Sequence, residues 1–255
     1  MTNILDSFRL DNKIALVTGS AGGIGAAIAT ALAQAGATVA AHGRRPPADI
    51  VAAIESAGGK ASAFAADLSD TSAPDALFAQ VLAKFGRVDI LVNNAGIILR
   101  EDAVNVPLAD WQKVIQINET AVFQLSQLAG RDMMKRNAPG KIINIASLLS
   151  FQGGIRVPSY AAAKGAVAQI TKALANEWAV KDIQVNAIAP GYIATNNTAQ
   201  LRADEVRSKA ILERIPAGRW GEATDVAGTA VFLASAAANY ITGHVLVVDG
   251  GWMAR

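Results

Sequence analysis

A repeating alternation of short apolar runs with amphipathic stretches constrains the fold of this chain more than any other feature. The apolar runs lie at residues 13–19, 38–42, 61–66, 89–93, 141–146, 183–188 and 245–248. The first of them is almost continuously apolar, which is typical of a strand covered on both faces. Strands that alternate with helices pair in parallel through right-handed crossovers. We therefore expect an α/β fold, with one doubly wound domain over residues 1–255 and a seven-stranded parallel sheet.

Amphipathic stretches between these runs predict the helices. They are clearest at residues 26–34, 74–85, 108–135 and 159–179. No Pro/Ser-rich linker and no internal repeat beyond the β-α alternation divides the chain. A long irregular section at 192–221 contains a polar, helix-like piece at 203–213. Loops of this length in compact domains often act as lids, so we expect a substrate lid there, the alternative being a surface excursion that only packs.

The charge balance and the missing residue types exclude several classes of protein. Lys and Arg total 23 against 21 for Asp and Glu, and no basic block is longer than Arg44-Arg45, so we do not expect a nucleic-acid partner. The chain has no cysteine, which excludes disulfides and thiolate chemistry. His42 and His244 are far apart in the sequence and lack clustered carboxylates, so we expect no metal site.

Hydropathy bears on where the protein acts. Charged residues interrupt the first thirteen positions, which lack the apolar core of a signal peptide. No apolar run approaches the ~20 residues that a membrane-spanning helix needs. We therefore expect a cytoplasmic protein that makes no membrane contact.

A glycine-rich turn, Thr18-Gly-Ser-Ala-Gly-Gly-Ile-Gly25, joins the first predicted strand to the first predicted helix. Glycines at this point let the backbone turn tightly and approach a pyrophosphate, and the helix N-terminus offers free N–H groups to its charge. Glycine-rich turns also occur where they only reverse the chain and bind no ligand. Enzymes that use S-adenosylmethionine have similar turns. Its position between strand and helix favours a dinucleotide and a Rossmann-type domain.

The residues after the second predicted strand bear on which dinucleotide is bound. Nicotinamide-binding folds often place a carboxylate there for the adenosine ribose, but this chain has Gly43 and Arg44. An arginine at this point can pair with a 2′-phosphate, so the sequence slightly favours NADP(H) and leaves NAD(H) open. The alternative is a solvated loop arginine. Asp67, after the third strand, is expected either to bond the adenine or to cap the turn that follows.

Tyr160 and Lys164 are four residues apart in a predicted helix and therefore share one face. A phenol with a pKa of about 10 is a poor base near neutrality. A neighbouring ammonium stabilises the phenolate and lowers that pKa, as does the positive charge of an oxidised nicotinamide. We expect Tyr160 to exchange a proton with an alcohol or a carbonyl while a hydride moves at carbon.

Two further polar residues lie where a substrate is expected. Ser147 follows the strand at 141–146, at the carboxyl end where open α/β sheets bind ligands, and its hydroxyl can bond the substrate oxygen. Asn118 lies inside the long predicted helix although Asn is a poor helix former. By itself it is equally an amide on the helix face that points to water.

These motifs, together with Asn93-Asn-Ala-Gly96 and Pro190-Gly191, resemble the short-chain dehydrogenase/reductase family in order and spacing across nearly the whole chain. The resemblance implies Tyr160 as general acid/base, Lys164 as pKa shifter and ribose ligand, and Ser147 as stabiliser of the substrate oxygen. It also implies that Asn118 holds a water in a proton relay. The full set of expected cofactor-binding residues is Gly19, Ser20, Gly23, Ile24, Gly25, Arg44, Asp67, Leu68, Asn94, Ala95, Gly96, Tyr160, Lys164, Pro190, Gly191, Ile193 and Thr195.

The segments 150–160, 189–197 and 214–221 resemble more closely the 2-deoxy-D-gluconate 3-dehydrogenase group, also called 2-dehydro-3-deoxy-D-gluconate 5-dehydrogenase. This resemblance implies a sugar-acid substrate. Arg156 lies between Ser147 and Tyr160 in the sequence, so its loop must pass near the reacting carbon, where an arginine can hold a carboxylate in bidentate fashion. The expected substrate-binding residues are Ser147, Gln152, Arg156 and Tyr160.

Two other arginines, Arg100 and Arg202, are expected to be solvated loop residues. At Gly43-Arg44 the chain lacks the carboxylate that is common after the second strand, which puts in doubt the NAD preference that the closer resemblance implies.

The expected activity is NAD(P)-dependent interconversion of a hydroxyl and a keto group on a sugar acid. Alternatives are another short-chain reductase (3-oxoacyl carrier-protein reductase, gluconate 5-dehydrogenase or uronate reductase) and a non-catalytic cofactor-sensing protein. The family resemblance also suggests a homotetramer, with an interface on the helices at 108–135 and 159–179.

Overall fold

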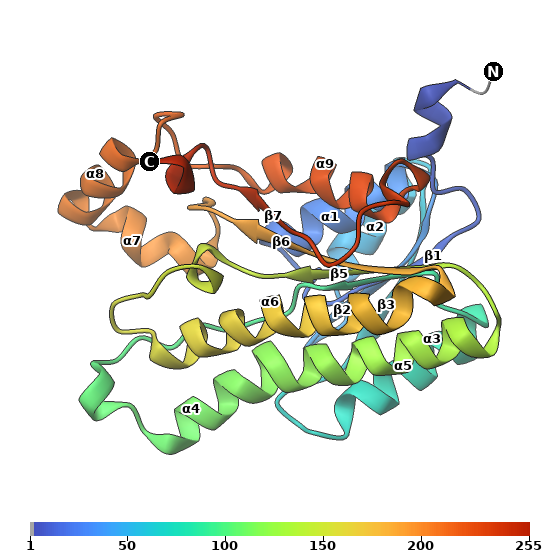
Figure 1. Ribbon diagram of the computed structural model, residues 1–255, viewed down its shortest axis with the longest axis horizontal. Helices are drawn as coiled ribbons and strands as arrows, with labels where there is room; N and C mark the ends of the chain where they lie inside the picture. Colours follow the sequence, from blue (N-terminus) through green and yellow to red (C-terminus); the bar gives the residue numbers. More distant parts are fainter. Residues whose placement is uncertain (1–2) are drawn as a thin grey trace.

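The computed structural model describes residues 3–255 and contains one sheet of seven parallel strands in the order β3-β2-β1-β4-β5-β6-β7 (Figure 1). The strands are β1 Ile14–Val17, β2 Thr38–Gly43, β3 Lys60–Ala65, β4 Ile90–Asn93, β5 Gly140–Ile145, β6 Ile183–Pro190 and β7 Val245–Val248. Each lies on one of the seven predicted apolar runs, so the α/β class and the seven-stranded parallel sheet are confirmed.

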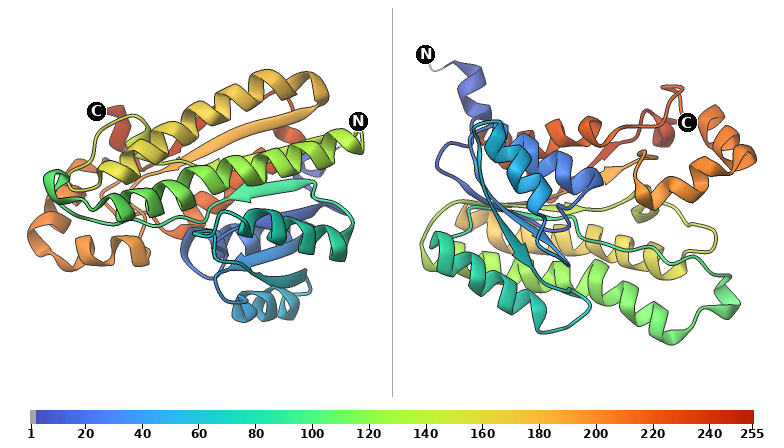
Figure 2. Two further views of the ribbon diagram at one scale, coloured as in Figure 1. Left: turned by 90° about the horizontal axis from the view of Figure 1, so that it is seen from below. Right: turned by 180° about the vertical axis from the view of Figure 1, so that it is seen from behind.

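Helices cover both faces of this sheet. They are α1 Gly23–Gln34, α2 Ala48–Ser56, α3 Ala73–Phe85, α4 Leu108–Ile115, α5 Ala121–Lys135, α6 Pro158–Trp178, α7 Ala199–Ala203, α8 Glu205–Arg214 and α9 Ala223–Ala234. In Figure 1, α1, α2 and α9 lie above the sheet, and α3, α5 and α6 lie below it. Figure 2 shows α5 and α6 running side by side along the lower face. None of the helices in residues 3–255 is long and apolar enough to cross a membrane.

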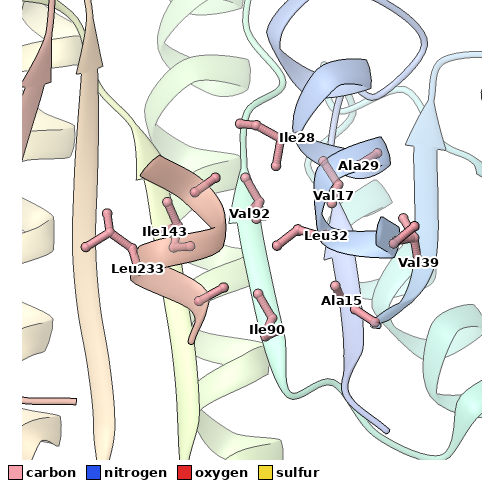
Figure 3. Close-up of a cluster of buried hydrophobic side chains, with 14 of the residues drawn as sticks. Ala15, Val17, Ile28, Ala29, Leu32, Val39, Ile90, Val92, Ile143 and Leu233 are labelled. Carbon is pink, nitrogen blue, oxygen red and sulfur yellow. The ribbon is translucent and has the colours of Figure 1, made fainter. Parts of the chain in front are cut away.

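The alternation of side chains along each strand divides the core into two layers. On β1, Ala15 and Val17 pack with α1 and α9, whereas Leu16 between them packs with α3, α5 and α6. Figure 3 shows the first layer, where Ile28 and Leu32 of α1 lie over the central strands. Because these side chains are fully buried, the strands tolerate few polar residues, which explains the continuous apolar runs of the sequence.

The strand order reverses between β1 and β4, which pair in parallel at the centre of the sheet. After β1 the chain moves outward to β2 and β3, and after β4 it moves in the opposite direction to β5, β6 and β7. The loops at the carboxyl ends of β1 and β4 therefore diverge and leave a crevice. Ligands of open α/β sheets bind at such a reversal point.

The predicted helix at 108–135 is continuous but contains one widened turn. Residues Gln116–Thr120 form a π-helical turn, here η3, between α4 and α5. Such single turns often occur at functional sites, because the extra residue displaces backbone groups from the regular ladder. Asn118 lies inside this turn.

The predicted lid begins and ends at neighbouring points on the molecule. The Gly221 N–H donates to the carbonyl of Tyr192 at 2.9 Å, and the Ala194 N–H donates to the carbonyl of Gly221 at 2.8 Å. Between these bonds, the short turn η6 (Asn196–Thr198), α7 and α8 project beyond the carboxyl end of the sheet (Figure 1). The helix-like piece predicted at 203–213 is the helix α8 together with the end of α7.

The remaining differences from the sequence prediction concern the ends of two elements and two helices that were not predicted. Residues Thr18 and Gly19 belong to the turn rather than to the first strand, and α1 begins at Gly23, three residues earlier than predicted. The helices α2 and α9 were not among the ranges identified from the sequence. Their stretches are rich in alanine, so the contrast between apolar and polar faces is weak.

Candidate active site

The glycine turn after β1 is held against the loop after β4 by a set of hydrogen bonds. The Asn94 amide donates to the carbonyls of Thr18 and Gly19, at 2.8 and 3.1 Å. The Thr18 hydroxyl accepts from the backbone N–H of Asn94 and of Ala95, both at 3.0 Å. These bonds join the two loops across the reversal point and hold the crevice in one shape.

The crevice is a cavity of about 490 Å³ that ends at the N-terminus of α1. Gly22 caps this helix without a side-chain hydrogen bond, so the first N–H groups of α1 face the cavity without a capping partner. A Cβ at Gly25 would collide with the Asn94 amide and the Gly19 carbonyl, so only glycine permits this close approach. No aspartate or glutamate lines the cavity among the described residues, which suits a polyanionic dinucleotide.

Most of the residues predicted to bind a cofactor line this cavity. They are Gly19, Gly23, Ile24, Gly25, Arg44, Asn94, Ala95, Gly96, Tyr160, Lys164, Pro190, Gly191, Ile193 and Thr195.

Ser20, Asp67 and Leu68 lie outside the lining. The Ser20 side chain is buried and donates to the carbonyl of His42 at 3.2 Å, while Leu68 packs in the lower core. Asp67 accepts from the backbone N–H and the hydroxyl of Ser69, at 3.0 and 2.8 Å, and so caps the turn, as the alternative interpretation expected.

His42, which the sequence argument considered only as a metal ligand, supports the glycine turn. Its Nδ1 accepts from the Gly19 N–H at 3.3 Å, and its Nε2 bonds the carbonyl of Ala66 at 3.1 Å. This pairing requires the neutral imidazole with its proton on Nε2. Burial lowers the pKa of His42, which favours the same neutral form. No cluster of residues suited to a metal ion occurs within the part of the chain that the structure describes.

Tyr160 and Lys164 lie on the first turns of α6, where Pro158 begins the helix. The Lys164 ammonium lies 5.6 Å from the centroid of the Tyr160 ring and donates to the carbonyl of Ile145 at 2.5 Å. Lys164 is only 4% exposed, and this burial lowers its pKa to about 8.

The surroundings of the Tyr160 hydroxyl act on its pKa in opposite directions. Burial raises the pKa, while the Ser147 hydroxyl and the positive charge of Arg100 lower it. Ser147 lies just after β5, and its Oγ accepts from the Leu149 N–H at 3.2 Å. The sequence argument assigned the neighbouring cation to Lys164 alone. The structure adds Arg100, because the fold brings the loop after β4 across to α6.

Asn118 is fully buried and does not point to water. Its Oδ1 accepts from the Ile97 N–H at 2.9 Å, and its Nδ2 donates to the Ile97 carbonyl at 2.8 Å. The side chain therefore joins the π-helical turn to the loop that follows β4. Each polar atom of its side chain therefore makes one hydrogen bond to the backbone of Ile97.

A second cavity, of about 380 Å³, adjoins the first and shares Ser147 and Tyr160 with it. Residues from the segment 192–221 line one side of it. Three arginines line it, namely Arg100 from the loop after β4 and Arg207 and Arg214 from α8. No aspartate or glutamate is among its lining residues within 3–255. A cavity of this charge beside a proton donor favours an anionic substrate.

Of the three arginines considered from the sequence, Arg100 and Arg156 differ from the expectation, whereas Arg202 does not. Gln152 lines the second cavity as predicted, but Arg156 does not, since its guanidinium pairs with Asp102 at 3.0 Å. Arg202 donates to the Thr195 carbonyl at 3.2 Å and also lies outside the lining. Arg100, expected to be a solvated loop residue, instead lines the cavity and is half-buried.

Four further residues line this cavity and were not identified as site residues from the sequence. They are Arg207, Arg214, Tyr192 and Trp252. The Arg214 guanidinium carbon lies 4.1 Å from the centre of the Trp252 ring, and Tyr192 packs against the same ring at 4.6 Å. The sequence offered one usable signal, which is the position of the two arginines in the predicted lid. The contribution of Trp252 depends on the return of the C-terminus to the lid, which no local pattern indicates.

Comparison with known proteins follows this geometry. The family described as enoyl-(acyl carrier protein) reductase matches residues 19–253. The chain is 53% identical over 252 residues to the 2-dehydro-3-deoxy-D-gluconate 5-dehydrogenase of Dickeya dadantii, covering 99% of this chain and 100% of that protein. The chain belongs to the short-chain dehydrogenase/reductase family.

Two crystal structures of short-chain dehydrogenases/reductases match the whole fold. One, from Agrobacterium tumefaciens, carries the provisional name 2-deoxy-D-gluconate 3-dehydrogenase and holds NADP; it is 55% identical with a TM-score of 0.91, covering 98% of this chain and 99% of that one. The other is a gluconate 5-dehydrogenase from Burkholderia cenocepacia in complex with NADP and tartrate, 38% identical with a TM-score of 0.95, covering 99% and 100%.

Proposed function

We propose that this protein is an NADP(H)-dependent oxidoreductase that interconverts a hydroxyl and a keto group on a sugar acid. One observation carries this proposal: the cavity that contains Ser147 and Tyr160 is also lined by three arginines and by no carboxylate side chain among the described residues. A proton donor, a hydroxyl that can bond the reacting oxygen, and cations that can bind a carboxylate therefore face one small space.

The first cavity supports a nicotinamide dinucleotide. The close approach at Gly25, the N–H groups of α1 and the absence of acidic lining residues within 3–255 suit its pyrophosphate. Arg44 lies at the end of this cavity, where a 2′-phosphate would distinguish NADP from NAD. The bound NADP of the two related crystal structures supports the same choice.

A bound nicotinamide would supply the hydride acceptor or donor of the proposed reaction. Ser147 bonds the substrate oxygen and holds it beside Tyr160. In oxidation, Tyr160 takes the hydroxyl proton as the hydride leaves carbon, and in reduction it returns a proton to the oxygen. Lys164 bonds the nucleotide ribose and adds positive charge near the phenolate. Asn118 keeps the loop after β4 in place through its two bonds to Ile97.

The substrate class follows from charge and size. Arginine guanidiniums bind carboxylates in forked geometry, and a cavity of about 380 Å³ suits a small molecule rather than a long acyl chain. The relatives support a hexonic acid: the Dickeya dadantii protein is named a 2-dehydro-3-deoxy-D-gluconate 5-dehydrogenase and the Burkholderia cenocepacia structure a gluconate 5-dehydrogenase. We therefore place 2-dehydro-3-deoxy-D-gluconate and gluconate first among substrates.

Three further features belong to the proposal. Residues 192–221 act as the substrate lid, since this segment supplies lining residues to both cavities. The protein works in the cytoplasm, where nicotinamide nucleotides are available. It assembles as a homotetramer, supported by the exposed Phe123 and Met134 on α5, and the mass in solution tests this assembly.

The decisive experiment is a substrate panel read by nicotinamide absorbance. Purified protein is tested with 2-dehydro-3-deoxy-D-gluconate, D-gluconate and 5-keto-D-gluconate, with matched neutral polyols, and with NAD(H) and NADP(H) separately. We expect turnover of at least one sugar acid with NADP(H) and at most weak turnover of polyols. Turnover of polyols alone would contradict the substrate class, and turnover of an acyl-carrier-protein thioester in place of all sugar acids would assign the chain to the other branch of its family.

A further inference from the structure

Arg100 connects the acid–base site to the lid. Its Nη2 donates to the backbone carbonyl of Asn197 at 3.0 Å, which spans from the loop after β4 to the turn η6. Asn197 lines both the nucleotide cavity and the substrate cavity. The guanidinium is therefore held by the segment of the lid that contacts both proposed ligands.

The second cation near Tyr160 is differently placed. The Lys164 ammonium is directed at the carbonyl of Ile145, and its pKa is lowered to about 8 by burial. Above that pH the lysine loses charge, whereas an arginine remains charged at every pH at which an enzyme works. Arg100 lines the same cavity as Tyr160 and is thus the permanent cation of this site, and its charge opposes the rise that burial causes in the pKa of Tyr160.

The other charges that face this part of the cavity are also cationic. Arg207 and Arg214 lie on α8, and burial together with the charge of Arg207 lowers the pKa of Arg100. Two guanidiniums on the same cavity repel each other. The hydrogen bond to the Asn197 carbonyl holds Arg100 against this repulsion.

We propose that Arg100 is a positioning residue for the acid–base step: held by the Asn197 carbonyl when the lid is closed, it provides the fixed positive charge that stabilises the Tyr160 phenolate. When the lid opens, the carbonyl moves away with η6, and Tyr160 becomes a weaker acid. An anionic substrate between Arg100 and Arg207 removes their repulsion and favours the closed arrangement. This inference deepens the proposed function, since it takes Tyr160 as the group that exchanges the proton.

The first test needs no substrate. The sequence has three tyrosines, Tyr160, Tyr192 and Tyr240, so tyrosinate absorbance can be followed against pH with few signals. Tyr160→Phe identifies the contribution of Tyr160 by subtraction. In Arg100→Gln we expect the Tyr160 midpoint to rise by about 1 pH unit, because a neighbouring positive charge has been removed. Arg100→Lys keeps a charge and should restore a large part of the shift.

The matched control is Arg156→Gln, an arginine of the adjoining loop that pairs with Asp102 and does not line the cavity. It should leave the Tyr160 midpoint unchanged. Circular dichroism and the NADPH dissociation constant verify that each variant is folded. An Arg100→Gln midpoint equal to that of the unaltered protein, or an equal shift in Arg156→Gln, would overturn the inference.

The second test uses the reaction. In the oxidative direction the ascending limb of kcat/KM reports the ionisation of the base, so Arg100→Gln should move that limb to higher pH by a similar amount. A fall in kcat/KM by the same factor at every pH would instead indicate lost substrate binding and would contradict the positioning role. If no sugar acid is turned over at all, the proposed function fails while the absorbance titration still decides the role of Arg100.

Discussion

The guanidinium of Arg156 is paired with the carboxylate of Asp102 at 3.0 Å, on the outer side of the substrate loop. The carbonyl of Arg156 also accepts from the Glu101 N–H at 3.0 Å. Arg156 therefore joins two loops at the surface and lies outside the linings of both cavities. Arg100, Arg207 and Arg214 line the second cavity and are better placed to bind a substrate carboxylate.

We expect Arg207→Gln and Arg214→Gln to raise KM for acidic sugars about tenfold or more, because each removes a charge-assisted hydrogen bond to a carboxylate. KM for neutral polyols should change little. Arg156→Gln is the matched control and should affect neither, since exposed ion pairs contribute little. The measurement is steady-state kinetics on the acid and polyol series, and a uniform rise of KM across both series would remove the carboxylate assignment.

Replacing Tyr160 by Phe removes the hydroxyl and leaves the ring in place. We expect kcat to fall by about a hundredfold or more, because proton transfer by a positioned group contributes at least that factor. NADPH binding, measured by fluorescence titration, should stay close to that of the unaltered protein. A variant that turns over near the original rate would show that another group moves the proton.

Arg44 and Arg45 are adjacent, but only Arg44 lines the nucleotide cavity. Arg44→Ala should weaken NADPH binding about tenfold or more and NADH binding much less, because the pair with a 2′-phosphate is lost. Arg45→Ala tests the neighbouring charge without that pair and should leave both dissociation constants nearly unchanged. Equal losses for NADPH and NADH in Arg44→Ala would reject the phosphate contact.

Two glycine-to-alanine changes separate a required glycine from a merely permitted one. Gly25→Ala places a Cβ against the Gly19 carbonyl and the Asn94 amide. We expect the free energy of unfolding to fall by about 1–3 kcal/mol and the affinity for the nucleotide to fall as well. In α9, a Cβ at Gly228 meets nothing, so Gly228→Ala should gain about 0.5–1 kcal/mol from helix propensity. Chemical denaturation measures both, and a neutral Gly25→Ala would contradict the close packing of the turn.

The pH dependence of stability should reflect two buried lysines. Burial lowers the pKa of both Lys141 and Lys164 from the ordinary lysine value of 10.5 to about 8. Between these values the unfolded chain binds more protons than the folded one, so the free energy of unfolding rises with pH from about 8. The raised pKa of Tyr160 acts in the opposite direction only above its ordinary value near 10.

Thermal unfolding midpoints across pH 8 to about 10 test this dependence. Lys141→Met should flatten the rise, because its contribution is removed, while the exposed Lys172→Met should retain it. Lys141 is chosen because it lies outside both proposed ligand cavities. A midpoint that falls steadily with pH in the unaltered protein would contradict the burial effect.

Much of this protein could be predicted from local pattern. The near-continuous apolar run of β1 indicated a doubly covered strand, since a residue on either face of a parallel sheet contacts a helix layer. The glycine turn and the Tyr160–Lys164 spacing indicated the nucleotide turn and one helix face, because both depend on residues close in sequence. Asn118 was named from family resemblance, and only the structure showed the π-helical turn and the two bonds to Ile97 that occupy its side chain.

The sequence by itself determined the sheet, its helices and the chain positions of the turn and the acid–base pair, because periodicity and local spacing dictate these. Tertiary structure alone decided which arginines line the proposed substrate cavity. Arg100 follows β4, Arg207 and Arg214 lie in α8 more than a hundred residues later, and Trp252 is near the C-terminus, yet all line one cavity. Crossovers of the sheet bring such distant loops together at one edge, and whether a guanidinium faces that cavity or pairs outward, as in Arg156, depends on contacts that no neighbouring residue in the sequence encodes.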